Sequence, residues 1–172
     1  MRNEGLKQIV LLLIAVVILF LAGCNGGAAM SEIDWTQGVL CVETGEFLHT
    51  DMTRGEMEQI LGAGEVTEKW ETGFFALYKD GSIGITYYKD YNNEIARIIW
   101  VYGSEFLVFG LSVGSTLENM IDALGEPCTT FLANELDSVD TDLYGYENID
   151  NFNMRIAFIV DPAEGKVISI VL

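Results

Sequence analysis

The sequence is poor in the side chains from which most catalytic and metal centres are built. Among its 172 residues there are one histidine, His49, and three cysteines. A lone histidine supplies no set of metal ligands. It also precedes the serine of a G-x-S-x-G match at 110–114, which is the reverse of the order that a hydrolase of that type needs. With no phosphate-binding loop either, we expect no enzyme activity, no metal, no cofactor and no small-molecule substrate.

Basic side chains are also scarce. Nine Lys and Arg face 26 Asp and Glu, which gives a formal net charge of −17. Such a surface repels nucleic-acid phosphates and anionic lipid headgroups, so neither is expected as a partner. The acidity fits either a solvated surface outside the cell or a preference for basic partners or cations. The spacing of five acidic residues is not that of an EF-hand, so we expect a solvated acidic loop, with calcium binding as the alternative. These residues are Asp137, Asp140, Asp142, Glu147 and Asp150.

Charge is absent from an aliphatic run at 9–23, which follows a short polar segment carrying Arg2 and Lys7. This order is typical of a secretory signal peptide, and the run is short for a membrane span of ~20 residues. The run ends in Leu21, Ala22, Gly23 and Cys24. That tetrapeptide resembles the lipobox of bacterial lipoproteins.

The lipobox resemblance implies cleavage before Cys24, a diacylglycerol on its thiol and acylation of the new amino terminus. Two or more acyl chains give stable anchoring. We therefore predict a signal peptide at 1–23, a flexible tether at 24–33 and a location on the extracytoplasmic side of the cell membrane or outer membrane. The alternative is an uncleaved anchor helix with an incidental cysteine.

One ten-residue pattern occurs twice, at 53–62 and again at 116–125. Each copy begins with a threonine that can cap a helix, carries an apolar face with methionine and leucine, and ends at a glycine. Strand-like stretches follow both copies, at 74–79, 82–89 and 94–102, and at 142–147, 153–160 and 166–172. The pattern predicts two repeats, 34–103 and 104–172, the second with a longer acidic loop at 133–142.

The second copy resembles a superfamily that includes the β-lactamase inhibitor proteins and the small lipoprotein of the outer-membrane β-barrel assembly machinery. The residues that carry it are Gly114-Ser115-Thr116, Met120 and Leu124-Gly125-Glu126-Pro127, and the first copy matches less well. The resemblance implies an α+β fold, with two tandem helix-plus-antiparallel-strand repeats forming one continuous sheet and the helices packed on one face. It implies that the other face binds a protein, and no enzyme activity.

Strand alternation assigns side chains to the two faces. The helix-facing set is Ile83, Ile85, Tyr87, Ile156, Phe158, Ile168 and Ile170. The opposite face or its rim would then carry the expected protein-binding residues, Tyr88, Arg97, Tyr144, Tyr146 and Arg155. Alternatively these aromatics pack between strands, because a slip of one residue exchanges the faces.

Cys41 and Cys128 remain after lipidation of Cys24, and they are either bonded to each other or free. The sequence thus predicts an exported, lipid-anchored, non-catalytic module that binds another protein of the bacterial cell envelope. The alternatives are a structural or assembly subunit of an envelope complex, and an inhibitor of an extracytoplasmic enzyme.

Overall fold

The computed structural model describes residues 36–133, 140–147 and 155–172. The leader, the lipobox with Cys24 and most of the acidic loop lie outside these residues, so what was expected of them stays a prediction. Within the described part of the chain, no helix is long and apolar enough to cross a membrane.

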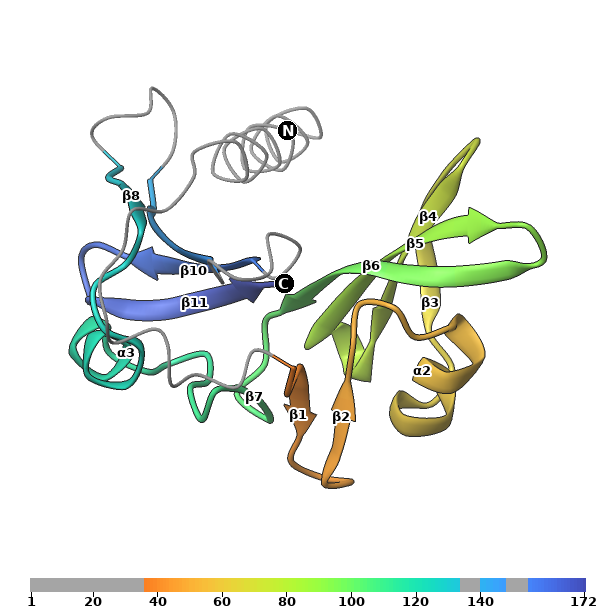
Figure 1. Ribbon diagram of the computed structural model, residues 1–172, viewed down its shortest axis with the longest axis horizontal. Coiled ribbons are helices and arrows are strands. Elements are labelled where there is room, and N and C mark those ends of the chain that lie inside the picture. Colours follow the sequence, from red (N-terminus) through yellow and green to blue (C-terminus); the bar gives the residue numbers. More distant parts are fainter. Residues whose placement is uncertain (1–35, 134–139, 148–154) are drawn as a thin grey trace. The chain divides into compact units, whose positions relative to one another are not determined.

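The described chain is mostly β-structure (Figure 1). It contains eleven strands in two antiparallel sheets and two short α-helices, α2 (Arg54–Leu61) and α3 (Leu117–Leu124). The expected two-repeat α+β fold, with helices packed on a sheet, is therefore wrong. Each helix has eight residues and buries two of them, which is too little to form a helical layer.

The larger sheet has eight strands. Their order across the sheet is β3 (Glu65–Trp70), β4 (Gly73–Tyr78), β5 (Ile83–Asp90), β6 (Asn93–Val101), β11 (Lys166–Val171), β10 (Arg155–Asp161), β9 (Asp142–Glu147) and β8 (Thr129–Phe131). The smaller sheet has the order β2 (Glu46–Leu48), β1 (Val39–Cys41) and β7 (Phe106–Val108). A 3-10 turn, η2 (Lys79–Gly81), joins β4 to β5.

The chain forms two compact units, which are described separately. The first unit comprises the described residues of 34–115 with 169–172, and the second comprises the described residues of 116–168. In the first unit, Phe74, Ala76 and Tyr78 of β4 lie opposite Tyr87, Ile85 and Ile83 of β5, and all six are buried. The Arg54 guanidinium lies 5.2 Å from the centroid of the Phe74 ring, so the first turn of α2 contacts this face of the sheet.

Both helices begin and end where the repeated pattern predicts. Thr53 caps α2 in a capping box with Glu56, and Thr116 caps α3 by accepting a hydrogen bond from the Asn119 backbone N–H. Gly62 and Gly125 follow the helices with φ angles of 83° and 78°. Glycine suits these positions because it adopts positive φ without a steric cost.

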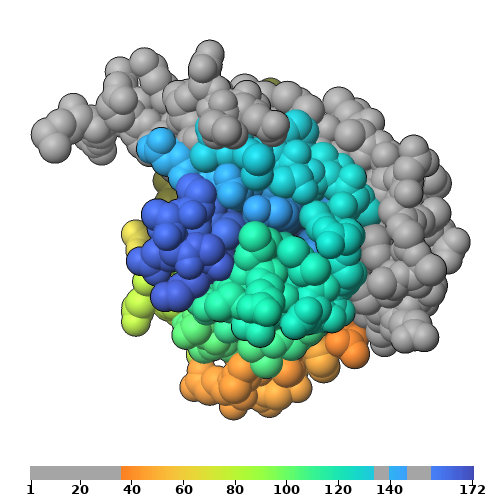
Figure 2. All heavy atoms as spheres, turned by 90° about the vertical axis from the view of Figure 1, so that its left-hand side faces the viewer, coloured from red at the N-terminus to blue at the C-terminus, as the bar shows by residue number. Residues whose placement is uncertain are grey.

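In the second unit, two further bonds fix α3. The Leu117 N–H donates to the Gly165 carbonyl at 2.9 Å, which ties the start of α3 to the turn between β10 and β11. Figure 2 shows these two segments side by side. At the other end of α3, the Tyr146 hydroxyl donates to the carbonyl of Gly125 at 3.0 Å.

This last bond overturns the predicted faces of β9. Tyr144 lies opposite Phe158 and Tyr146 opposite Ile156, and directly opposed residues share one face of a sheet. Tyr144 and Tyr146 therefore lie on the α3 side together with the isoleucine and the phenylalanine, and they are 8% and 2% exposed. The expectation that both tyrosines lie on an open face is wrong.

Two neighbouring strands also differ from the alternation expected of them. Ile168 is exposed, and Val167 and Ser169 on either side of it are buried, so the assignment of Ile168 to the helix-facing set is wrong. Residues 83–87 of β5 are buried on both faces of the strand. Alternation predicts a solvated face only where one side of a strand meets water, and neither side of β5 at 83–87 does.

Candidate protein-binding surface

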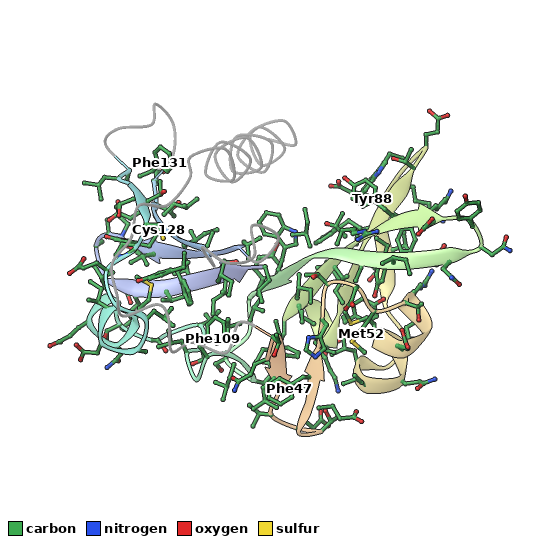
Figure 3. All side chains as sticks on the ribbon, viewed as in Figure 1. Phe47, Met52, Tyr88, Phe109, Cys128 and Phe131 are labelled. Carbon is green, nitrogen blue, oxygen red and sulfur yellow. The ribbon has the colours of Figure 1, made fainter. Side chains whose placement is uncertain are left out.

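The first unit has a second sheet face, opposite the one that Arg54 of α2 contacts. In the register of the sheet, Trp70 of β3, Gly73 of β4 and Tyr88 of β5 form one row across it. The two rings meet edge to face with centroids 6.1 Å apart, and they remain 38% and 41% exposed. Gly73 permits this approach, because a Cβ there would lie 2.9 Å from the indole Nε1 of Trp70 and 2.2 Å from a backbone carbonyl. Tyr88 is labelled in Figure 3.

A partly covered apolar surface adjoins this pair. Phe75, Leu77 and Ile98 on the same face are half-buried, and Trp100 is buried. The Phe75 ring lies over Gly84 of β5, where a Cβ would come within 2.3 Å of it. Trp70 and Tyr88 are thus the exposed margin of a larger apolar surface.

A third aromatic residue protrudes at the same end of the sheet. Tyr91 occupies the turn between β5 and β6, and its side chain is fully exposed. The Lys89 N–H donates to the Thr72 carbonyl at 2.9 Å, which links the β3–β4 turn to β5 just before this tip. Figure 1 shows both turns at one end of the first unit. We call Trp70, Tyr88 and Tyr91 the aromatic end.

Tyr91 adopts a backbone conformation that suits glycine. Its φ is 53°, in the left-handed region. For a residue with a side chain this region costs about 1–2 kcal/mol relative to the right-handed one. Because the ring is fully exposed, packing within the described residues does not offset that cost. Strain of this kind gathers at binding and catalytic positions in proteins.

Three carboxylates neighbour the aromatic end in the register or in the chain, as do the exposed Lys69 and Lys89. Glu68 lies opposite Phe75 in the register, so it shares the face of Trp70. Glu71 follows Trp70 directly in the β3–β4 turn, and Asp90 precedes Tyr91 at the hairpin tip. All three carboxylates are exposed, whereas Lys69 and Lys89 alternate with Trp70 and Tyr88 along their strands and so lie on the opposite face.

The five predicted binding residues have different outcomes. Tyr88 is exposed and lies beside Trp70, and Arg97 is exposed at a bulge in β6. Tyr144 and Tyr146 are buried in the second unit. Arg155 pairs in register with Glu147, and its side chain is outside those described.

Sequence reasoning missed Trp70 and Tyr91. Each has a signal beside it in the sequence. Trp70 precedes Glu71-Thr72-Gly73, a turn sequence, and Tyr91 adjoins the pair Asn92-Asn93. A large aromatic residue next to such a turn is placed at the end of a hairpin, where few neighbours can cover it.

The other candidate sites take different roles. Asp142 accepts a hydrogen bond from the Ala133 N–H at 2.8 Å and closes the base of the acidic loop. Asp137 and Asp150 of the calcium alternative lie outside the described residues, and those that are described contain no group of side chains suited to a metal ion. Cys41 is a free thiol buried in β1, so it does not form a disulfide with Cys128.

Comparison of the sequence with protein-family models and with curated proteins finds no match. Among solved structures, the chain is similar to a DUF4309 family protein, YjgB, from Bacillus subtilis. The two share 15% sequence identity and align over 76% of this chain and 88% of that one, with a TM-score of 0.45. A likeness at that level carries no argument about function.

Proposed function

We propose that this chain is an exported, lipid-anchored and non-catalytic protein-binding module of the bacterial cell envelope. The observation that carries the binding role is the exposed Trp70–Tyr88 pair beside a half-buried apolar surface. Tryptophan and tyrosine dominate the energetics of protein interfaces, because they bury a large area with few rotatable bonds. The anchoring role rests on the leader and on the lipobox at Cys24.

Site-specific photocrosslinking in living cells tests the binding role. A photoreactive phenylalanine analogue is placed at position 88, and at position 47 as the control, because Phe47 is 39% exposed in the smaller sheet. We expect a discrete crosslinked product from position 88 that is absent from position 47 and is lost with Trp70→Ala. The same product from both positions, or none from position 88, would contradict the proposal.

Fractionation tests the anchor. Cys24→Ser removes the thiol that accepts the lipid, and we expect this variant to leave the detergent phase and to lack the mass of the acyl chains. A variant that stays in the membrane fraction at unchanged mass would show that Cys24 is not lipidated. The crosslinking test does not depend on this result, so the two parts of the proposal fail separately.

A further inference from the structure

We propose that the aromatic end binds a basic segment of a partner protein, with an arginine or lysine side chain placed on the rings of Trp70 and Tyr88 between the neighbouring carboxylates. This inference rests on the proposed binding function and specifies the chemistry of the partner. It goes beyond that function because it names the charge, the contact and the shape of what is bound.

Charge decides between the possible occupants. Glu68, Glu71 and Asp90 are exposed beside the aromatic residues in register or sequence, Lys69 and Lys89 lie on the opposite face of their strands, and the whole chain carries a formal charge of −17. A second copy of this chain, a nucleic acid or an anionic membrane would each bring further negative charge to that surface. A cationic side chain is attracted both by the carboxylates and by the electron-rich faces of the aromatic rings.

The protein already contains such an arrangement on the opposite face of the same sheet. The Arg54 guanidinium lies over the Phe74 ring, and it is paired with Glu58 at 2.7 Å and with Glu94 at 3.4 Å. An aromatic ring bordered by carboxylates thus holds a guanidinium within this unit. The aromatic end has the same kinds of group, rings and carboxylates, and they face solvent.

The outer edge of the sheet argues against a partner that adds a strand. β3 is the outermost strand, and a bulge between Val66 and Glu68 interrupts its register. Lys69 and the neighbouring glutamates are exposed along it. Bulges and charges on an edge strand discourage strand addition, so the basic segment lies across the aromatic end and not along the edge.

Tyr91 supplies evidence that does not depend on charge. Its positive φ is a cost to the folded chain, and its ring makes up for none of that cost by burial. A tyrosine at this turn therefore disfavours folding and is suited to a contact made by the hairpin tip. Replacing Tyr91 with glycine distinguishes a binding role from a structural one. Glycine relieves the backbone strain, which should not lower stability, and removes the ring, which should weaken binding.

Selection from a random dodecamer peptide library displayed on phage tests the inference without assuming a sequence. The purified chain, residues 24–172, is the bait. We expect the selected peptides to be enriched in arginine and lysine, and their affinity to fall as salt rises. Trp70→Ala and Tyr91→Gly should each weaken binding at least tenfold, whereas Phe47→Ala, a control of similar exposure, should leave it unchanged.

Thermal unfolding of the same variants completes the test. Tyr91→Gly should unfold at the same or a higher temperature than the parent while losing peptide binding, a combination that a merely structural role would not produce. Selected peptides without excess basic residues, no selection at all, or binding unaffected by Trp70→Ala and Tyr91→Gly would overturn the inference. If position 88 still yields its crosslinked product in cells, the proposed function stands and the basic partner alone is wrong.

Discussion

The hydroxyl groups of Tyr78 and Tyr87 lie 2.8 Å apart beneath α2, and both side chains are almost wholly buried. Burial raises the pKa of both tyrosines above the ordinary value. Both therefore stay neutral at physiological pH, and either hydroxyl can be the donor. The pair satisfies two polar groups that would otherwise be buried among Phe74 and its apolar neighbours.

This pair should show strong coupling on mutation. Tyr78→Phe leaves the buried hydroxyl of Tyr87 without the tyrosine that bonds to it, and we expect a loss of about 1–2 kcal/mol in the free energy of unfolding. The double change to phenylalanine removes both hydroxyls and should cost less than the sum of the single changes. Urea unfolding of the four proteins gives the coupling energy, and strictly additive losses would contradict the interpretation.

Tyr146 and Tyr144 offer a matched comparison in the second unit. The Tyr146 hydroxyl bonds the Gly125 carbonyl at the end of α3 at 3.0 Å, whereas the Tyr144 hydroxyl reaches Asp142 only at 3.5 Å. Tyr146→Phe should therefore destabilise the fold by about 1 kcal/mol, and Tyr144→Phe by less. Amide exchange at the end of α3 should accelerate in the first variant alone. Equal effects would show that the bond to Gly125 contributes nothing.

The two helix caps should respond differently to pH. Hydrogen bonds from the Thr53 side chain and backbone lower the pKa of Glu56 below its ordinary value. A lowered pKa means that this stabilisation is complete above the unfolded-state pKa of Glu56 and is lost as the pH falls through the lower folded value. Asn119 occupies the corresponding place behind Thr116 and does not titrate.

The measurement is amide exchange in the first turn of each helix as a function of pH, corrected for the intrinsic rate. We expect protection in α2 to fall in that acidic range and protection in α3 to stay constant. Glu56→Gln should abolish the difference between the helices. Thr53→Ala and Thr116→Ala should each cost about 1 kcal/mol at neutral pH. A pH-dependent α3, or an α2 that keeps its protection in acid, would contradict the assignment.

Replacing Ser169 should stabilise the protein. Its hydroxyl is buried in β11 and has no hydrogen-bond partner among the residues described. A buried hydroxyl without a partner costs about 1–3 kcal/mol, so Ser169→Ala should raise the free energy of unfolding. Ser112→Ala is the contrasting change, because Ser112 is only half-buried. Chemical denaturation of both variants decides the matter, and a destabilised Ser169→Ala would show that the hydroxyl is satisfied.

Part of the candidate site was predictable. Tyr88 was singled out from strand alternation, and it is exposed as expected. Trp70, which contacts Tyr88, was not singled out. The two residues come together only because β3 and β5 each pair with β4, one on either side of it. Tyr144 was misplaced because alternation describes which residues share a face within one strand. It does not say which face of that strand meets the helix.

The sequence by itself determined the local elements. Thr53, Gly62, Thr116 and Gly125 set the ends of both helices, since caps and stops depend on residues within one turn. Tertiary structure decided the fold class and the exposed surface. The pairing of β1 with β7, in which Val39 lies opposite Val108, completes the second sheet and joins segments distant in the chain, whereas β1 and β2 form a local hairpin. Three-residue strands carry too little periodicity to announce such a pairing, because a strand is stabilised by its neighbours and not by its own residues.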